Sequence, residues 1–314
     1  MISARLCVAA LVTLFALPAG ADEAFVTAQG ADALDIVDLS TMKRVATLAI
    51  GGKPAGVAVS RDGAHAYVTS PEGKFLSVID AKARRVEKRL NIEGGPLGVA
   101  VAPDGARVYV ADLYGSRLIE IDPATNARRS VGVGAMASGV AVAPDGKTIL
   151  VADRDDNALS IIDAEKFERV AVLPVGKHPF GVTIDAAGAR AFTANVESDD
   201  VSVIDLPGRK IVATLKTGSR PYTVALAGGR IFVANQHGDS VSVFDAATLT
   251  PIETVPVGEY PEGIAASHDG RAVFVANWFS NELWAIDAQT LKVLGKAATG
   301  DGPRAFGAFV GASP

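Results

Sequence analysis

The sequence predicts an all-β fold, a seven-bladed β-propeller, from three observations: a repeat of about 40 residues, four strand-like segments in each repeat, and chain ends that are out of phase with the repeat. Helical repeats of this length would show a 3.6-residue period instead. Successive units are 40 to 42 residues apart, as measured between aspartates that each close a short apolar run, at Asp38, Asp80, Asp122, Asp163, Asp205, Asp245 and Asp287.

Residues 97–132 show the four expected strands of one blade. Residues 98–101 are wholly apolar, as expected for an inner strand that is buried on both faces, and residues 103–105 (Pro-Asp-Gly) form a turn. The second and third strands are expected at residues 107–111 and 117–121, and the fourth follows at the outer edge. Each blade therefore has four antiparallel strands.

The two ends of the chain together complete one blade. The repeats begin on a second strand, Phe25–Ala28, and end on a first strand, Arg304–Val310. We therefore expect one C-terminal and three N-terminal strands to close the ring, which leaves no open blade edge.

Residues 1–21 have the pattern of a cleaved secretory signal peptide. Arg5 is the only charged residue, an apolar run extends from Leu6 to Leu17, and small residues at Ala19 and Ala21 precede the cleavage point. The apolar run is too short to span a bilayer. We expect a signal peptide at 1–21, a propeller domain at 22–314 and a periplasmic protein.

Composition limits the chemistry of the mature chain. The one cysteine, Cys7, lies in the signal peptide, so thiol chemistry and cysteine-ligated metals are excluded. Removal of Arg5 leaves 29 basic and 35 acidic residues, a net charge of −6. A mildly acidic surface disfavours non-specific binding to nucleic acid and to anionic lipid.

The second strands carry a recurring motif that resembles the YVTN family of bacterial β-propellers over essentially the whole mature chain. The motif precedes Ser-Val-Ile-Asp and Val-Gly-x-x-Pro-x-Gly, and it reads Phe25-Val-Thr-Ala28, Tyr67-Val-Thr-Ser70, Tyr109-Val-Ala-Asp112, Phe192-Thr-Ala-Asn195, Phe232-Val-Ala-Asn235 and Phe274-Val-Ala-Asn277. The resemblance implies an exported or surface protein that is an accessory to a quinone-dependent or metal-dependent redox system. A propeller hosts many functions, so the motif predicts fold more than activity.

Residues that recur in every blade are interpreted as structural. The seven aspartates at the ends of the third strands are expected to cap turns, because copies spread around a ring are too far apart to act together. The polar residues that end the second strands are expected to make Asx-type turns, and an alternative in which they bind calcium, as in a lactonase, stays open. They are Ser70, Asp112, Asp153, Asn195, Asn235 and Asn277.

The candidate site consists of residues that differ between blades. They flank the repeated proline between a fourth strand and the next first strand, or lie between second and third strands, and they are bulky or charged mainly in the last four blades. We expect an anion-accepting mouth of the central channel, formed by Arg220, Arg304, Tyr222, Tyr260, Glu262, His178, His237, Trp278 and Lys53. The alternative is that these side chains only plug a water-filled hole.

Three functions remain open on the sequence. The first is a periplasmic binding protein that presents its loop face and channel mouth to a partner protein or a small anionic molecule. The second is a lactonase or lyase with a channel-mouth site, and the third is single-stranded DNA binding, which the net charge disfavours. The lack of a recognisable catalytic set favours the first. No metal site or cofactor is expected, with a divalent cation left open at His178, His237 and Glu262.

Overall fold

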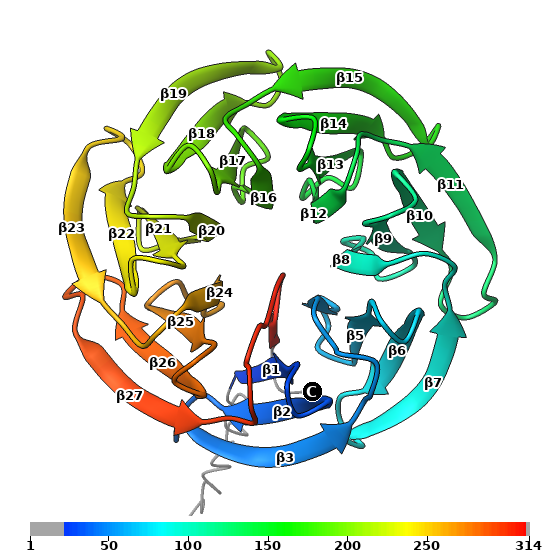
Figure 1. The fold of residues 1–314 in the computed structure, drawn as a ribbon, viewed down its shortest axis with the longest axis horizontal. Coiled ribbons are helices and arrows are strands. Elements are labelled where there is room, and N and C mark those ends of the chain that lie inside the picture. The colour runs from blue at the N-terminus through cyan, green and yellow to red at the C-terminus, as the bar shows by residue number, and fades with distance from the viewer. Residues whose placement is uncertain (1–21, 312–314) are drawn as a thin grey trace, which may run out of the picture.

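Residues 22–311, described by a computed structural model, form seven four-stranded antiparallel sheets arranged as a ring (Figure 1). The prediction of a seven-bladed β-propeller is confirmed. The predicted signal peptide, residues 1–21, lies outside the described residues. No helix among the described residues is long and apolar enough to cross a membrane.

Each blade runs from an inner strand at the ring's centre to an outer strand at its rim (Figure 1). Blades 2, 3 and 4 consist of β4 (Val57–Val59), β5 (His65–Ser70), β6 (Phe75–Asp80) and β7 (Arg85–Asn91); β8 (Pro96–Val101), β9 (Val108–Asp112), β10 (Arg117–Ile121) and β11 (Arg128–Gly132); β12 (Ala137–Val142), β13 (Thr148–Asp153), β14 (Ala158–Asp163) and β15 (Glu168–Pro174). Blades 5, 6 and 7 consist of β16 (Pro179–Ile184), β17 (Arg190–Asn195), β18 (Asp200–Asp205) and β19 (Lys210–Lys216); β20 (Pro221–Ala227), β21 (Arg230–Asn235), β22 (Ser240–Asp245) and β23 (Pro251–Pro256); β24 (Pro261–Ala266), β25 (Ala272–Asn277), β26 (Glu282–Asp287) and β27 (Val293–Ala298).

Blade 1 is the composite blade, with β28 (Val310–Gly311) beside β1 (Glu23–Ala28), β2 (Ala33–Asp38) and β3 (Lys43–Ala49). The expected closure is therefore present, but the inner strand is much shorter than the predicted Arg304–Val310. Ala305 and Gly307 have positive φ, 44° and 124°, and interrupt the strand. A Cβ at Gly307 would lie 2.4 Å from the carbonyl oxygen of Val57, so the bend needs a glycine.

Backbone hydrogen bonds still fasten the C-terminal segment on both sides. The amide of Phe25 donates to Phe309 and the amide of Arg304 donates to Thr27, at 2.8 and 2.7 Å. On the other side the amide of Val57 donates to Phe306 at 2.9 Å. The segment thus joins β1 to the inner strand of blade 2.

Neighbouring blades touch through glycines of their inner strands. A Cβ added to Gly98 would lie 1.9 Å from the carbonyl oxygen of Ser138, and one added to Gly139 would lie 2.3 Å from that of Phe180. The same contact recurs at Gly56, Gly181 and Gly263. The final glycine of the Val-Gly-x-x-Pro-x-Gly motif is therefore required because the next blade's backbone approaches too closely for a side chain.

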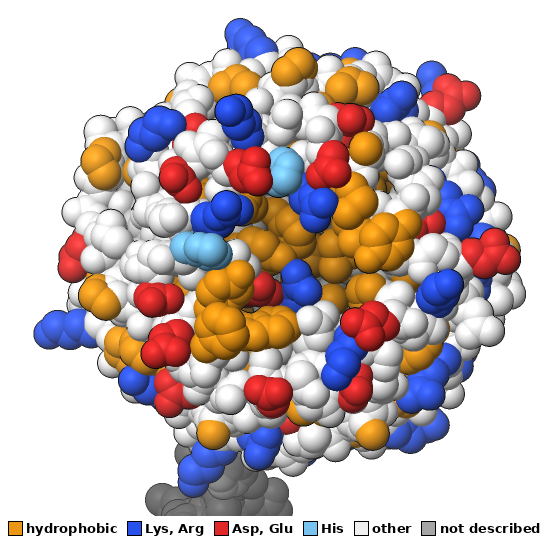
Figure 2. Space-filling view, in the orientation of Figure 1, with side chains coloured by type: hydrophobic (Ala, Val, Ile, Leu, Met, Phe, Trp, Pro, Cys, Tyr) orange, Lys and Arg blue, Asp and Glu red, His pale blue; other side chains and the backbone are white. Residues whose placement is uncertain are grey.

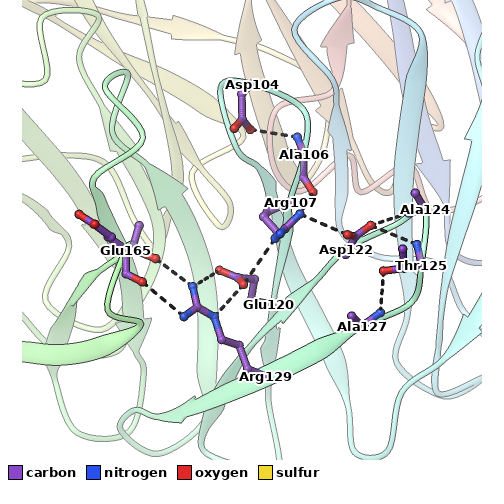
Figure 3. A network of polar contacts seen from close by, with 11 residues as sticks. Asp104, Ala106, Arg107, Glu120, Asp122, Ala124, Thr125, Ala127, Arg129 and Glu165 are labelled. Atoms are coloured by element: carbon purple, nitrogen blue, oxygen red, sulfur yellow. Dashed lines mark hydrogen bonds and ion pairs between the residues drawn. The ribbon is translucent and has the colours of Figure 1, made fainter.

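Most of the repeated aspartates cap turns, as predicted, whereas Asp205 accepts no backbone amide hydrogen bond within residues 22–311. In blade 3, Asp122 accepts hydrogen bonds from the amides of Ala124 and Thr125, and nearby Arg129 binds Glu120 through two nitrogens while reaching the backbone of the next blade at Glu165 (Figure 3). Carboxylate caps of this kind are present in six of the seven blades, at Asp38, Asp80, Asp122, Asp163, Asp245 and Asp287.

The residues that end the second strands behave differently from one another. Asp112 makes the expected Asx-type turn, accepting from the amides of Tyr114 and Gly115. Asn195 and Asn235 instead donate to Ser202 and Ser242 on the adjacent third strand, at 3.0 and 2.9 Å. The Asx-turn prediction is wrong for these asparagines, because their amide groups point back along the sheet to serine hydroxyls.

Candidate functional site

The mouth of the channel is a cavity of about 480 Å³ on the face that carries the loops before the inner strands. Figure 2 shows this face hollowed at its centre, with hydrophobic side chains inside and Lys, Arg, Asp, Glu and His side chains around the hollow. Seven of the nine predicted site residues line it, namely Lys53, His178, Arg220, Tyr222, Tyr260, Glu262 and Arg304.

The residue that follows the repeated proline is apolar and buried in several blades. In four blades this position holds Ala55, Leu97, Phe180 and Tyr222, which are buried together with Phe306 in one apolar cluster. The rings of Phe180 and Tyr222 stack with centroids 4.1 Å apart, and Phe180 lies 4.7 Å from Phe306. We call Phe180, Tyr222 and Phe306 the aromatic plug. It forms an apolar floor beneath the cavity.

In blade 7 and the composite blade the same position holds Glu262 and Arg304, which form a buried ion pair. Nε of Arg304 lies 2.9 Å from Oε2 of Glu262, and the side chains are 18% and 5% exposed. The two atoms do not meet the angle of a hydrogen bond, so the contact is electrostatic. Gln236 donates to the other carboxylate oxygen at 2.7 Å, and Arg304 donates to the hydroxyl of Tyr222.

Burial governs the titration of this polar wall. Desolvation raises the pKa of Glu262, and the adjacent Arg304 charge opposes that rise. Burial also raises the pKa of Tyr222, so its hydroxyl stays protonated and accepts from Arg304. The wall thus places the Glu262 carboxyl group against the Arg304 guanidinium above the aromatic plug.

The residue that precedes the repeated proline forms the rim. Lys53, His178, Arg220 and Tyr260 all adopt positive φ, between 52° and 59°. This left-handed conformation is uncommon for side chains other than glycine and costs roughly 1–3 kcal/mol where it occurs. The same conformation recurs in turns around the whole ring, for example at Asp32 and Arg209, so it is a feature of the repeated backbone that fixes where the rim side chains stand.

A side-chain oxygen 21 residues earlier holds each rim residue in place. It accepts a hydrogen bond from the rim amide: Asp32 from Lys53 at 2.8 Å, Asn157 from His178 at 2.9 Å, Asp199 from Arg220 at 2.7 Å and Asp239 from Tyr260 at 2.8 Å. The anchors have left-handed φ themselves. The rim is therefore positioned by the blade scaffold rather than by flexible loops.

The positively charged side chains that line the mouth cavity differ in whether a carboxylate lies beside them. Lys53 lies 3.4 Å from Asp32, and Arg154 lies 2.9 Å from Asp155. Arg304 is paired with Glu262. Within residues 22–311, Arg220 has no carboxylate within 4.0 Å of its guanidinium. The two predicted anion-binding arginines thus differ, because Arg220 carries the uncompensated charge.

Two predicted site residues stand behind the rim rather than lining the cavity. The ring of His237 lies 5.3 Å from that of Tyr260, and the guanidinium of Arg304 lies 5.8 Å from the ring of Trp278. His178 lines the cavity, with Nδ1 3.2 Å from Glu197. Among the described residues no group of three or more His, Cys, Asp or Glu side chains is placed to hold a metal ion.

Sequence reasoning missed several lining residues of the loops between second and third strands. These are Gln29, Glu72, Leu113, Tyr114, Arg154 and Gln236. Tyr114 is the most prominent, with 70% of its surface exposed. The sequence does carry a signal for them, because the residues just after the second strands also vary between blades, as His237 and Trp278 do.

The comparisons place the chain in a family. The family described as YNCE-like beta-propeller matches residues 9–107 and 191–311, more than half of the chain, and the chain belongs to this family. No curated protein matches the sequence.

Two solved structures share the fold. One is the Kuenenia stuttgartiensis hydrazine synthase, with a TM-score of 0.74 and 21% identity, covering 83% of this chain and 90% of that one. The other is a functionally unknown protein from Desulfotomaculum acetoxidans, with a TM-score of 0.77 and 17% identity, covering 90% and 99%. At these identities the likeness is one of fold alone.

Proposed function

We propose that this protein is a binding protein whose channel mouth holds a small molecule with a carboxylate and a flat apolar body. The observation that carries the proposal is Arg220, a guanidinium without a carboxylate partner among the described residues, held at the rim of a cavity whose floor is aromatic. An arginine fork matches a carboxylate through two parallel hydrogen bonds.

The two sides of the cavity suit the two ends of such a ligand. Leu97, Leu113 and Tyr114 form an apolar wall, which would cover a ring or a hydrocarbon body. Gln236, Glu262 and Arg304 lie among the polar lining residues, and Arg220 stands at the rim. A volume of about 480 Å³ is within the range of small-molecule sites.

We further propose that the protein acts in the periplasm and that the same loop face contacts a protein partner, as an accessory to a redox system. The apolar run 6–17 and the small residues at 19–21 support export. The resemblance to exported propellers supports the accessory role. Intact mass of the protein recovered from the periplasmic fraction tests the first part: a chain that begins at Asp22 is expected, and a chain that keeps Met1 would contradict export.

The binding proposal is tested with 2-naphthoate as the anionic probe and 2-naphthamide as its neutral counterpart, by isothermal titration. Naphthoate is expected to bind the native protein more tightly than the amide. The substitution Arg220→Ala should weaken naphthoate binding about ten- to a hundredfold, the loss expected for one charge-assisted contact, and leave amide binding unchanged.

Arg209→Ala is the matched control. Arg209 also has a positive φ, of 49°, but it lies in a turn between third and fourth strands, on the opposite face. Its loss should leave naphthoate binding unchanged. Equal binding of naphthoate to the native protein and to Arg220→Ala would show that the mouth is not an anion site.

A further inference from the structure

The channel contains a second cavity, at its other end, of about 500 Å³. Its walls are the inner strands, which reach it with their C-terminal halves, and its floor includes Phe306 of the aromatic plug. We call it the aliphatic well and define it by Ala100, Val142, Ile184, Leu226, Ala266 and Ala308. The plug separates the well from the mouth, so a ligand of the well would bind independently of the proposed function of the mouth.

The side chains of the well are almost wholly aliphatic. Among the described lining residues there is no charged side chain, and the two polar ones are Thr183 and Thr223. The hydroxyl of Thr183 donates to the carbonyl of Val224 at 2.7 Å, and that of Thr223 donates to the carbonyl of Glu262. Both hydroxyls are therefore occupied by the neighbouring blades, and no side chain of the well is left to bind a polar group.

Several side chains on the wall of the aliphatic well are partly exposed to solvent. Val101, Val142, Ile184 and Leu226 line the well and are half-buried. Water in the well would meet few polar side chains, and an apolar ligand would release it.

The shape and chemistry of the well determine the class of ligand. Strands from all seven blades surround one axis, and the aromatic plug lies at the inner end, so a ligand would enter the well from its outer end. The volume is that of a small-molecule site. A charged group inside would meet no side chain of opposite charge among the described lining residues. We propose that the aliphatic well binds a single hydrocarbon chain whose uncharged polar end stays at the open face.

Binding of straight-chain primary alcohols from octanol to tetradecanol, followed by isothermal titration, tests this proposal. One alcohol per chain is expected, with affinity rising about fourfold for each added methylene, which corresponds to about 0.8 kcal/mol per buried CH₂. The rise should stop once the chain is longer than the well is deep. Dodecanoate, which has a charged end, should bind this site more weakly than dodecanol.

Two separate substitutions fill the well from different sides. Ala100→Phe in blade 3 and Ala308→Phe in the C-terminal segment each place a ring among the lining residues, and each should weaken dodecanol binding at least tenfold. Ala127→Phe, at an exposed turn position, is the matched control and should bind as the native protein does. Melting temperatures are measured for all variants, and two independent fillings protect the test against one variant that fails to fold.

Three outcomes would overturn the proposal. They are the absence of saturable alcohol binding, an affinity that does not grow with chain length, and binding that survives both fillings. The mouth variant Arg220→Ala should retain native alcohol binding, so failure of the mouth proposal and failure of the well proposal give different results. Alcohol binding that Arg220→Ala abolishes would place the chain in the mouth and contradict the inference.

Discussion

Arg304 and Glu262 are in contact at 2.9 Å although they occupy the same position in successive repeats, directly after the repeated proline. In blades 5 and 6 that position holds Phe180 and Tyr222, which stack in the aromatic plug. One repeat position therefore supplies both the apolar floor and the buried ion pair of the mouth. Opposite charges at this position can meet because consecutive blades are neighbours in the ring.

Because Glu262 and Arg304 form an ion pair, the losses of unfolding free energy in their single variants should not add up in the double variant. Glu262→Ala leaves the largely buried Arg304 without its counter-charge and should cost about 3 kcal/mol of unfolding free energy. Arg304→Ala should cost a similar amount, while the double variant should lose much less than the sum. Urea unfolding of the four proteins measures this. Glu259→Ala, an exposed neighbour, is the control, and additive losses would show that the two charges do not interact.

Backbone strain at the rim predicts an inverted order of alanine and glycine. Arg220 has a φ of 53°, which glycine adopts without penalty and alanine does not. Arg220→Gly should therefore be about 1 kcal/mol more stable than Arg220→Ala, whereas glycine normally destabilises. Both variants should lose naphthoate binding alike. A glycine variant less stable than the alanine variant in urea unfolding would contradict the strain.

The buried carboxyl group of Asp153 should make the free energy of unfolding depend on pH. Its side chain is buried, Ser160 donates to one oxygen at 2.7 Å, and the other oxygen has no partner. Burial raises the pKa of Asp153 to about 6, above its value of 3.8 in an unfolded chain. The folded state therefore holds the proton more tightly, so this residue's contribution to stability falls as pH rises from about 4 to about 6 and stays low above that range.

Asp153→Asn should raise the unfolding free energy at pH 7.5 by on the order of 1–3 kcal/mol and remove that part of the pH dependence. Asparagine is already present at this position in three other blades, as Asn195, Asn235 and Asn277. Asp112→Asn is the opposing control, because Asp112 pairs with Arg117 at 2.9 Å and should lose stability. The midpoints of urea unfolding at pH 4.5 and 7.5 test this prediction. If Asp153→Asn were less stable than the native protein at pH 7.5, the raised pKa assigned to Asp153 would be refuted.

Closure of the ring predicts a cooperative loss of stability when the C-terminal segment is removed. A chain truncated after Gly300 lacks β28 and the buried Phe306 and Phe309, and should unfold at a lower temperature and over a broader range than the full chain. Phe309→Ala alone should cost about 3–5 kcal/mol, because its side chain is fully buried. Phe279→Ala, 62% exposed, is the control and should change little. A truncated chain that melts like the full one would rule out closure by this segment.

Much of the fold could be predicted from the repeat. The third strand of blade 3 was predicted at residues 117–121 and is β10, Arg117–Ile121. The predicted inner closing strand is longer than the observed one. A glycine at position 307 is compatible with a strand in the sequence, and the bend of the backbone there is explained only by the close approach of Val57 in the next blade. Seven of nine mouth residues could be found because they depart from the repeat, whereas Tyr114 and Arg154 lie in loops whose sequences do not show which side chains turn toward the cavity.

The sequence by itself determined the number of blades, the order of strands in each blade, the composite closure and the arc of variable residues at the mouth. These features are carried by period and alternation, which are local properties of a chain that repeats. Only the tertiary structure decided that Arg304 is neutralised by Glu262 while Arg220 is not, and that the channel holds an aromatic plug with a polar cavity on one side and an aliphatic well on the other. Those outcomes depend on distances between side chains of different blades. Electrostatic and packing energies change strongly over one or two ångströms, and the repeat pattern of the sequence does not specify distances that finely.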